Sequence, residues 1–206
     1  MTEIYNACSF GPACMSASIL KRNNIKKCSY PFDWIFSDHY IVKHCIEDNF
    51  ITFLDKSYYV DIKDKWHDNQ CGHERYHPNM FNHRDIRNKE NYEYFKRCVN
   101  RFLSLMRDPK KKLFVITNIN LTSVDPYYII DIVNFNESIS HRIQDYTLLV
   151  IFHLPNKEVR SHVFRSHKNI QFLELHTLSS SNGNKFIDEE DNNYLDSILK
   201  NAYIFR

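Results

Sequence analysis

Short apolar runs alternate with segments of helical periodicity along most of this chain. The apolar runs cover residues 4–10, 113–117, 147–153 and 170–176. The helical segments cover residues 13–22, 38–49, 91–106, 128–141 and 188–200, and residues 161–166 fit neither pattern. Strands separated by helices pair in parallel through crossover connections, and parallel strands buried on both faces have continuous apolar sequences. The alternation therefore predicts an α/β fold, a three-layer sandwich with a mainly parallel central sheet.

Residues 55–90 interrupt this alternation. The segment is rich in His, Asp, Asn, Tyr and Trp and has no clear period. A segment of this kind inside a compact domain is typical of a binding or active-site insertion, unless it holds short strands that the pattern does not resolve. Because the 206 residues show no repeat and no linker, we expect a single α/β domain over residues 1–206 with an irregular insertion at about 55–90.

The charge and the apolar stretches exclude two classes of partner. The chain has 27 Lys and Arg against 25 Asp and Glu, a formal net charge of +2, with the two signs interspersed. A nucleic-acid-binding protein typically carries a basic stripe, so we expect no nucleic-acid partner. No apolar stretch approaches the roughly 18 to 20 residues that cross a bilayer. We therefore expect no membrane partner, a cytoplasmic location and six cysteines that remain thiols.

The turn after the first apolar run contains one of only three glycines, Gly11, followed directly by Pro12. Glycine adopts backbone conformations closed to other residues and proline suits a helix start, so the pair predicts a tight strand-to-helix turn. Ligands of parallel α/β sheets bind where strands end and helices begin. Cys14 falls in the first helical turn, where free N–H groups and the helix dipole favour a thiolate. Cys14 is therefore a candidate nucleophile; the alternative is a structural cysteine packed beneath the turn.

Two motifs carry a resemblance to a known family. Residues 9–14 read Ser-Phe-Gly-Pro-Ala-Cys, and residues 29–34 read Ser-Tyr-Pro-Phe-Asp-Trp. They resemble the Ser-Leu-Gly-x-x-Cys and Ser-Tyr-Pro-Phe-Asp-Trp motifs of the family named "Putative papain-like cysteine peptidase", domains of unknown function in bacteria and large DNA viruses. Phe10 stands where the family has Leu. Residues 81–83, Phe-Asn-His, match the family's Phe-x-His element.

The resemblance implies a Cys/His pair, with Cys14 as the nucleophile and His83 as the base. It also implies a papain-like α+β fold, which is the alternative to the predicted sandwich. If the chain is viral, its location would be the host cytoplasm.

A Cys/His mechanism needs a histidine that takes the thiol proton and a third group that holds the ring. Asp33 and Asp85 are the candidate groups that would orient His83. His153 and His176 end apolar runs near the predicted carboxyl edge of the sheet, so either can replace His83 as the base. Asp33 also has a structural alternative, because Asp commonly caps helices and turns.

Two further patterns are incomplete. Five side chains have the chemistry of zinc ligands, but their spacing matches no common zinc motif, so we predict neither a metal nor a cofactor: His67, Cys71, His73, His77 and His83. Asp191 and Tyr194 resemble the Asp-x-x-His of SGNH-type esterases. Since Tyr194 cannot act as that histidine, an SGNH-esterase-like domain with a degenerate site is only an alternative.

The sequence thus favours a cysteine-dependent hydrolase that acts on a peptide, another amide or an ester. The N–H groups of residues 13–15 would hold the oxyanion. The alternative from a different class is a non-catalytic binding module, in which the motifs only build a pocket. No pattern specifies an oligomeric state.

Overall fold

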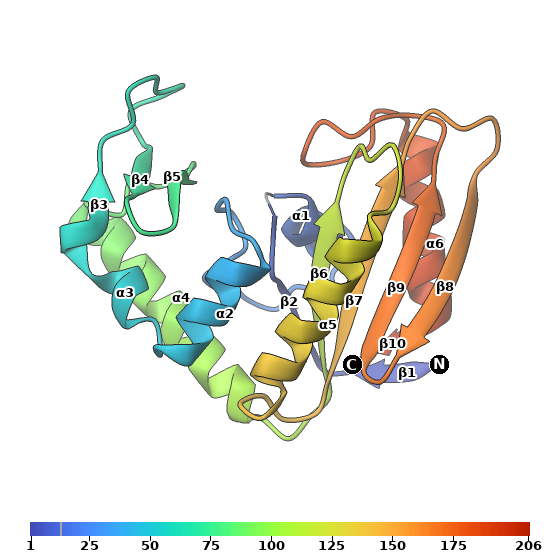
Figure 1. Ribbon diagram of the computed structural model, residues 1–206, viewed down its shortest axis with the longest axis horizontal. Helices are drawn as coiled ribbons and strands as arrows, with labels where there is room; N and C mark the ends of the chain where they lie inside the picture. The colour runs from blue at the N-terminus through green and yellow to red at the C-terminus, as the bar shows by residue number, and fades with distance from the viewer. Residues whose placement is uncertain (13) are drawn as a thin grey trace.

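The computed structural model describes residues 1–12 and 14–206 and is shown in Figure 1. Its helices are α1 (Met15–Arg22), α2 (His39–Glu47), α3 (Ile51–Leu54), α4 (Lys89–Arg107), α5 (Pro126–Ser140) and α6 (Glu189–Ala202), with a 3₁₀ turn η1 (Lys56–Tyr58). Its strands are β1 (Thr2–Ile4), β2 (Asn6–Ser9), β3 (Tyr59–Val60), β4 (Cys71–His73), β5 (His77–Phe81), β6 (Lys112–Asn118), β7 (Tyr146–Leu154), β8 (Ser161–His167), β9 (Ile170–His176) and β10 (Tyr203–Phe205).

The central sheet has five strands in the order β2-β6-β7-β9-β8. The first four pair in parallel, and β8 pairs antiparallel to β9 at one edge. The predicted adjacency of the apolar runs 4–10, 113–117 and 147–153 in a largely parallel sheet is therefore confirmed. The first run is divided, because β1 pairs with β10 in a separate two-stranded sheet. The fold is mixed α/β around a mainly parallel sheet.

Neighbouring side chains of the central strands enter two different hydrophobic clusters. Phe114 on β6 and Val150 on β7 belong to the cluster that includes side chains of α2, α4 and α5. Val115 and Leu149 belong to the other cluster, with side chains of α1 and α6. Because both faces of these strands are buried, their sequences are continuously apolar.

Capping residues set the ends of the helices, and hydrophobic periodicity predicts these ends only approximately. α5 begins earlier than predicted, because Asp125 accepts a hydrogen bond of 2.9 Å from Tyr127 N–H and Pro126 occupies the first helical position. The first helix was predicted from residue 13, which lies outside the described residues, and α1 is described from Met15.

Residues 55–90 contain η1 and a three-stranded antiparallel sheet in the order β3-β4-β5. Of the two alternatives that the sequence left open for this segment, short strands are therefore present. The small sheet lies beside α3 and α4, on the side of the molecule away from β8 (Figure 1). β5 ends at Phe81, just before His83.

A chain of buried aromatic rings connects the end of β2 to the end of β5. Phe10 stacks on Phe114 with ring centroids 4.3 Å apart and meets the edge of Phe32 at 6.0 Å. Phe32 contacts Phe53 at 6.5 Å, and Phe53 contacts Phe81 at 5.6 Å. All five rings are fully buried. The part of the molecule that holds the central sheet and the part that holds the sheet β3-β4-β5 therefore share one aromatic core.

A buried ion pair holds the segment between α1 and α2. Lys26 Nζ contacts the carboxylate of Asp33, and their side chains are 9% and 0% exposed. Tyr30 N–H also donates to Asp33 Oδ2, at 2.6 Å. Burial raises the pKa of Asp33, and Lys26 and the hydrogen bonds oppose that rise. The ion pair thus ties together two points of the chain that are seven residues apart.

Gly11 occupies a turn that requires glycine. Its φ of +86° lies in the left-handed region, and a Cβ at this position would lie 3.1 Å from Ser37 O. The Gly11 carbonyl accepts hydrogen bonds from Thr117 N–H at 3.2 Å and from the Ser16 hydroxyl at 3.0 Å. The turn is therefore fixed between β6, α1 and the segment that leads to α2.

We predict that Gly11→Ala lowers the free energy of unfolding by about 2–4 kcal/mol, because it adds backbone strain and crowds Ser37. Gly183→Ala is the matched control. Gly183 also has a positive φ, of +95°, but a Cβ there would meet nothing within 4 Å. The control should lose only about 1 kcal/mol. Equal losses in urea denaturation would show that contact with Ser37 does not constrain the turn.

Asp33→Ala should lower the free energy of unfolding by about 3–5 kcal/mol, because Lys26 would remain buried without its partner. The matched control is Glu137→Ala, which breaks an ion pair with Lys168 whose side chains are 52% and 60% exposed. That variant should leave stability nearly unchanged, since both partners face water. Chemical denaturation measures both, and a similarly small loss for the two variants would contradict the prediction.

Candidate active site

Cys14 is the N-terminal cap residue of α1, and its side chain is half-buried. Its φ and ψ are −81° and −15°, and no side chain caps the helix by accepting a hydrogen bond in the described part of the chain. The N–H groups of the first turn, such as that of Met15, have no partner within the helix. The start of α1 therefore presents free donors beside a thiol.

His83 follows β5, and its main chain is held by the side chain of Asn69. Asn69 Nδ2 donates to His83 O at 2.7 Å, and Asn69 Oδ1 accepts from Asp85 N–H at 2.9 Å. The His83 side chain itself is exposed. Asn69 thus fixes the backbone that carries the ring.

The structure brings Cys14 and His83 together across 69 positions of sequence. Cys14 Sγ lies 3.3 Å from His83 Nε2, within hydrogen-bonding distance for a sulfur atom. This is the arrangement in which an imidazole can take a thiol proton.

Burial favours the neutral form of both Cys14 and His83. It raises the pKa of the Cys14 thiol. It lowers the pKa of His83, and the neighbouring His67, whose ring centroid is 6.5 Å away, lowers it further. Both shifts favour a neutral thiol beside a neutral imidazole. Burial therefore opposes the thiolate that the helix start was predicted to favour.

The two candidate orienting carboxylates have other partners. Asp33 binds Lys26, and Asp85 accepts hydrogen bonds from Arg87, the shortest from Nη2 at 2.6 Å. Within residues 1–12 and 14–206, neither carboxylate hydrogen-bonds to His83, and His83 Nδ1 has no hydrogen-bond partner. In the described residues, His83 is positioned through its backbone and not through its second ring nitrogen.

The two alternative bases are held by their own neighbours. His153 Nδ1 accepts from Asn120 N–H at 3.2 Å, so its Nε2–H donates to Thr177 Oγ1 at 2.7 Å. Burial lowers the pKa of His153 to about 4. His176 Nε2 lies 2.9 Å from Glu174 Oε1. Of the three histidines considered, the described contacts bring only His83 to Cys14.

Asp191 holds the loop before α6, and Tyr194 joins α6 to β8. The Asp191 carboxylate is buried and accepts from Arg160 Nε and from the Ser179 hydroxyl, each at 2.7 Å. The Tyr194 hydroxyl lies 2.7 Å from His162 Nδ1. The Asp191 contacts stabilise the loop before α6, and the Tyr194 contact links α6 to the edge strand β8.

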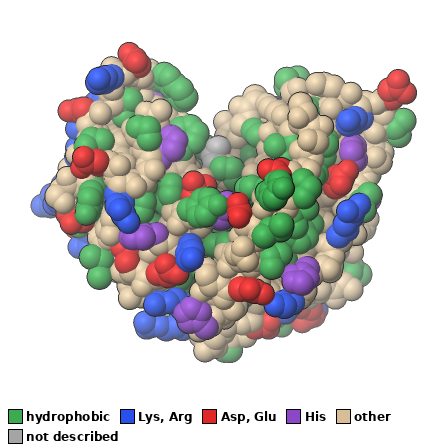
Figure 2. All heavy atoms as spheres, viewed as in Figure 1, with side chains coloured by type: hydrophobic (Ala, Val, Ile, Leu, Met, Phe, Trp, Pro, Cys, Tyr) green, Lys and Arg blue, Asp and Glu red, His purple; other side chains and the backbone are tan. Residues whose placement is uncertain are grey.

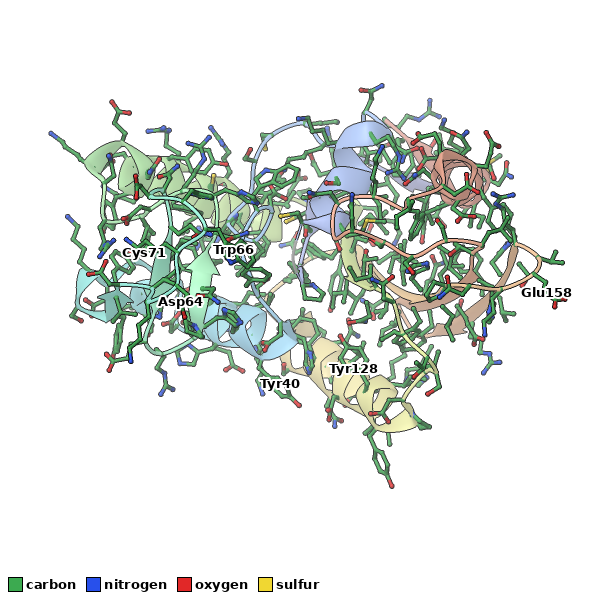
Figure 3. The ribbon with its side chains drawn as sticks, turned by 90° about the horizontal axis from the view of Figure 1, so that it is seen from above. Tyr40, Asp64, Trp66, Cys71, Tyr128 and Glu158 are labelled. Atoms are coloured by element: carbon green, nitrogen blue, oxygen red, sulfur yellow. The ribbon has the colours of Figure 1, made fainter. Side chains whose placement is uncertain are left out.

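An open cleft of about 410 Å³ lies beside His83 and is lined by Trp34, Asn69, His83, Arg84 and Asn184. Figure 2 shows the surface hollowed between the two parts of the molecule. In Figure 3, seen from above, Trp66 and Cys71 mark one part and Glu158 the far end of the other. The segment 55–90, whose composition is typical of a binding or active-site insertion, contributes three of the lining residues and so forms one wall of the cleft.

Arg84, Asn69 and Asn184 are lining residues that the sequence did not single out. Their loops carry no motif, and only the tertiary arrangement brings them to one cleft. Within the described ranges 1–12 and 14–206, no three His, Cys, Asp or Glu side chains are grouped so that they could hold a metal ion. No helix in those ranges is long and apolar enough to span a membrane.

Comparison with known proteins gives one match. Searches of curated proteins and of solved structures found none. A family profile matches residues 6–156, well over half of the 206 residues, and this range includes Cys14, Asp33 and His83. The chain therefore belongs to the family described as "Putative papain-like cysteine peptidase".

Proposed function

We propose that this protein is a cysteine-dependent hydrolase that cleaves an amide or ester bond, with Cys14 as the nucleophile and His83 as the base. The contact of 3.3 Å between Cys14 Sγ and His83 Nε2 carries the proposal. Family membership supports it, since the family's description names a cysteine peptidase.

The reaction proceeds in two balanced steps. Cys14 Sγ attacks the carbonyl carbon while its proton passes to His83 Nε2, and the imidazolium then protonates the leaving amine or alkoxide to give a thioester. In the second step His83 takes a proton from water, which attacks the thioester carbonyl. The C–S bond breaks, the acid leaves, and the proton returns to Sγ. The lowered pKa of His83 supports this role, because only the neutral ring can accept a proton.

The first turn of α1 would stabilise the oxyanion. The backbone N–H groups of Cys14 and Met15 lie at the positive end of the helix dipole, and no side chain in the described residues caps that end. Loss of one such donor typically costs about 10²- to 10³-fold in rate. Residue 13, whose N–H was also predicted to contribute, lies outside the described residues.

Asp33 would act on this site through the backbone. Its ion pair with Lys26 fixes the segment that ends at Trp34, and Trp34 lines the cleft. We assign Asp33 to positioning of that wall and not to orientation of the imidazole.

The scaffold of the proposed site would be a three-layer sandwich forming one domain over residues 1–206. Two clusters of side chains, one with α1 and α6 and one with α2, α4 and α5, support that arrangement.

A second candidate function is a binding module without catalysis. The raised pKa of Cys14 favours it, because a neutral thiol is a weak nucleophile. The cleft would then hold a ligand without cleaving it.

Cys14→Ser should abolish hydrolysis of activated esters and fluorogenic amides, because the hydroxyl is a much poorer nucleophile than the thiol. His83→Ala should lower kcat/KM by about 10²-fold or more. Cys28→Ser, at the other half-buried cysteine, is the control and should retain full activity. Hydrolysis that persists in Cys14→Ser would favour the binding module. A correctly folded protein that shows no hydrolysis with or without the substitutions would also favour it.

The pH dependence of Cys14 tests the protonation state of the pair. With the thiol pKa raised and the imidazole pKa lowered, alkylation of Cys14 by iodoacetamide should rise steadily from about pH 6 to beyond about pH 8.5, the reference thiol pKa. In turnover, kcat/KM should increase with pH through the lowered pKa of His83, below the reference of about 6.5, and be level near neutral pH. Fast alkylation independent of pH below about pH 7 would instead reveal a thiolate–imidazolium pair.

A further inference from the structure

Arg84 is fixed at the cleft directly after His83. Its guanidinium lies over the ring of Tyr94, with Cζ 4.4 Å from the ring centroid. Nη1 also lies 3.4 Å from Asn91 Oδ1. These two contacts hold the guanidinium in one orientation while most of its five N–H donors stay free.

In the described part of the chain, the positive charge of Arg84 has no acidic partner. The nearest carboxylate in sequence, Asp85, is bound to Arg87 at 2.6 Å, and Arg87 also binds Asp61 at 2.7 Å. Among residues 1–12 and 14–206, no carboxylate lies within ion-pair distance of Arg84. An unpaired cation therefore faces the cleft beside the Cys14–His83 pair.

The other side chains that line the cleft do not compete for this role. Trp34 and Asn184 are neutral, and both amide atoms of Asn69 are engaged by the main chain of the His83 loop. His83 also lines the cleft, but burial lowers the pKa of its ring and so favours the uncharged form. Arg84 is thus the group that can distinguish an anionic ligand from a neutral one. Its planar fork of donors matches a carboxylate bidentately.

We propose that Arg84 binds a carboxylate or another anionic group of the substrate, so that the preferred substrates carry a negative charge close to the bond that is cleaved. This inference rests on the proposed function, because it takes Cys14 as the attacking group. It adds the class of substrate: acidic peptides, or amides and esters with a free carboxylate.

Two alkylating reagents test the inference without a known substrate. Iodoacetate and iodoacetamide have nearly the same size and react alike: Sγ forms a C–S bond, iodide leaves, and the thiol proton is released. They differ in that one carries a carboxylate and the other an amide. The rate ratio of iodoacetate to iodoacetamide is measured on the Cys14 peptide by mass spectrometry, at low salt and about pH 8.5, where most thiols react. The same ratio for the unfolded chain is the reference.

We expect the ratio for Cys14 in the folded protein to exceed the reference by about 3- to 10-fold, as a single charge at short range in a wet cleft would produce. It should fall with added salt. Arg84→Gln should lower the rate ratio to the value that the positive end of the α1 dipole produces by itself. Arg84→Lys should retain part of the increase. Arg97→Gln is the control: it removes the same charge from an exposed position on α4 that does not line the cleft.

The outcomes separate this inference from the proposed function. A ratio that Arg84→Gln and Arg97→Gln change equally, or that no variant changes, overturns the role of Arg84 while Cys14 remains reactive. A Cys14 that neither reagent alkylates faster than the buried cysteines overturns both, because the cleft then gives no access to the sulfur.

Discussion

The chain of contacts from Phe10 through Phe32 and Phe53 to Phe81 is the interaction on which the rest of the structure depends. Cys14 follows Phe10 around the Gly11 turn, and His83 follows Phe81 at the end of β5. The separation of 3.3 Å between Cys14 Sγ and His83 Nε2 therefore depends on rings that pack in the core. Truncation of one buried Phe typically costs about 3–5 kcal/mol, so the geometry of the site and the stability of the fold are coupled.

The parts of the fold that could be predicted are those in which burial leaves a clear pattern. β6 and β7 are buried on both faces, and their continuous apolar runs gave both their positions and their parallel pairing. β8 is exposed along its whole length, so it had no such signal and forms only by pairing with β9. β3 and β4 are too short to show a period, and a shift of register between Cys71 and His73 disrupts the alternation further.

The site could be predicted in part, for local reasons. Gly11 identified the turn because its φ of +86° and its approach to Ser37 both need glycine, and the turn identified Cys14. The prediction of a thiolate at Cys14 takes the helix end into account but not burial, which raises the pKa of the thiol. No pattern in the sequence indicated Arg84, because its proposed role depends on which carboxylates already have partners in the folded protein.

The attachment of His83 through Asn69 has a consequence for the range of leaving groups that the proposed hydrolase would accept. A ring held at its second nitrogen is fixed in one direction. In the described residues, Nδ1 of His83 has no hydrogen-bond partner, and Asn69 holds the residue by a contact of 2.7 Å to its main-chain carbonyl. In the proposed reaction, rotation about the side-chain bonds would let Nε2 turn from the sulfur toward a departing group and then toward water. A base held in this way would be less preorganised, but it could protonate amines and alkoxides that leave at slightly different angles.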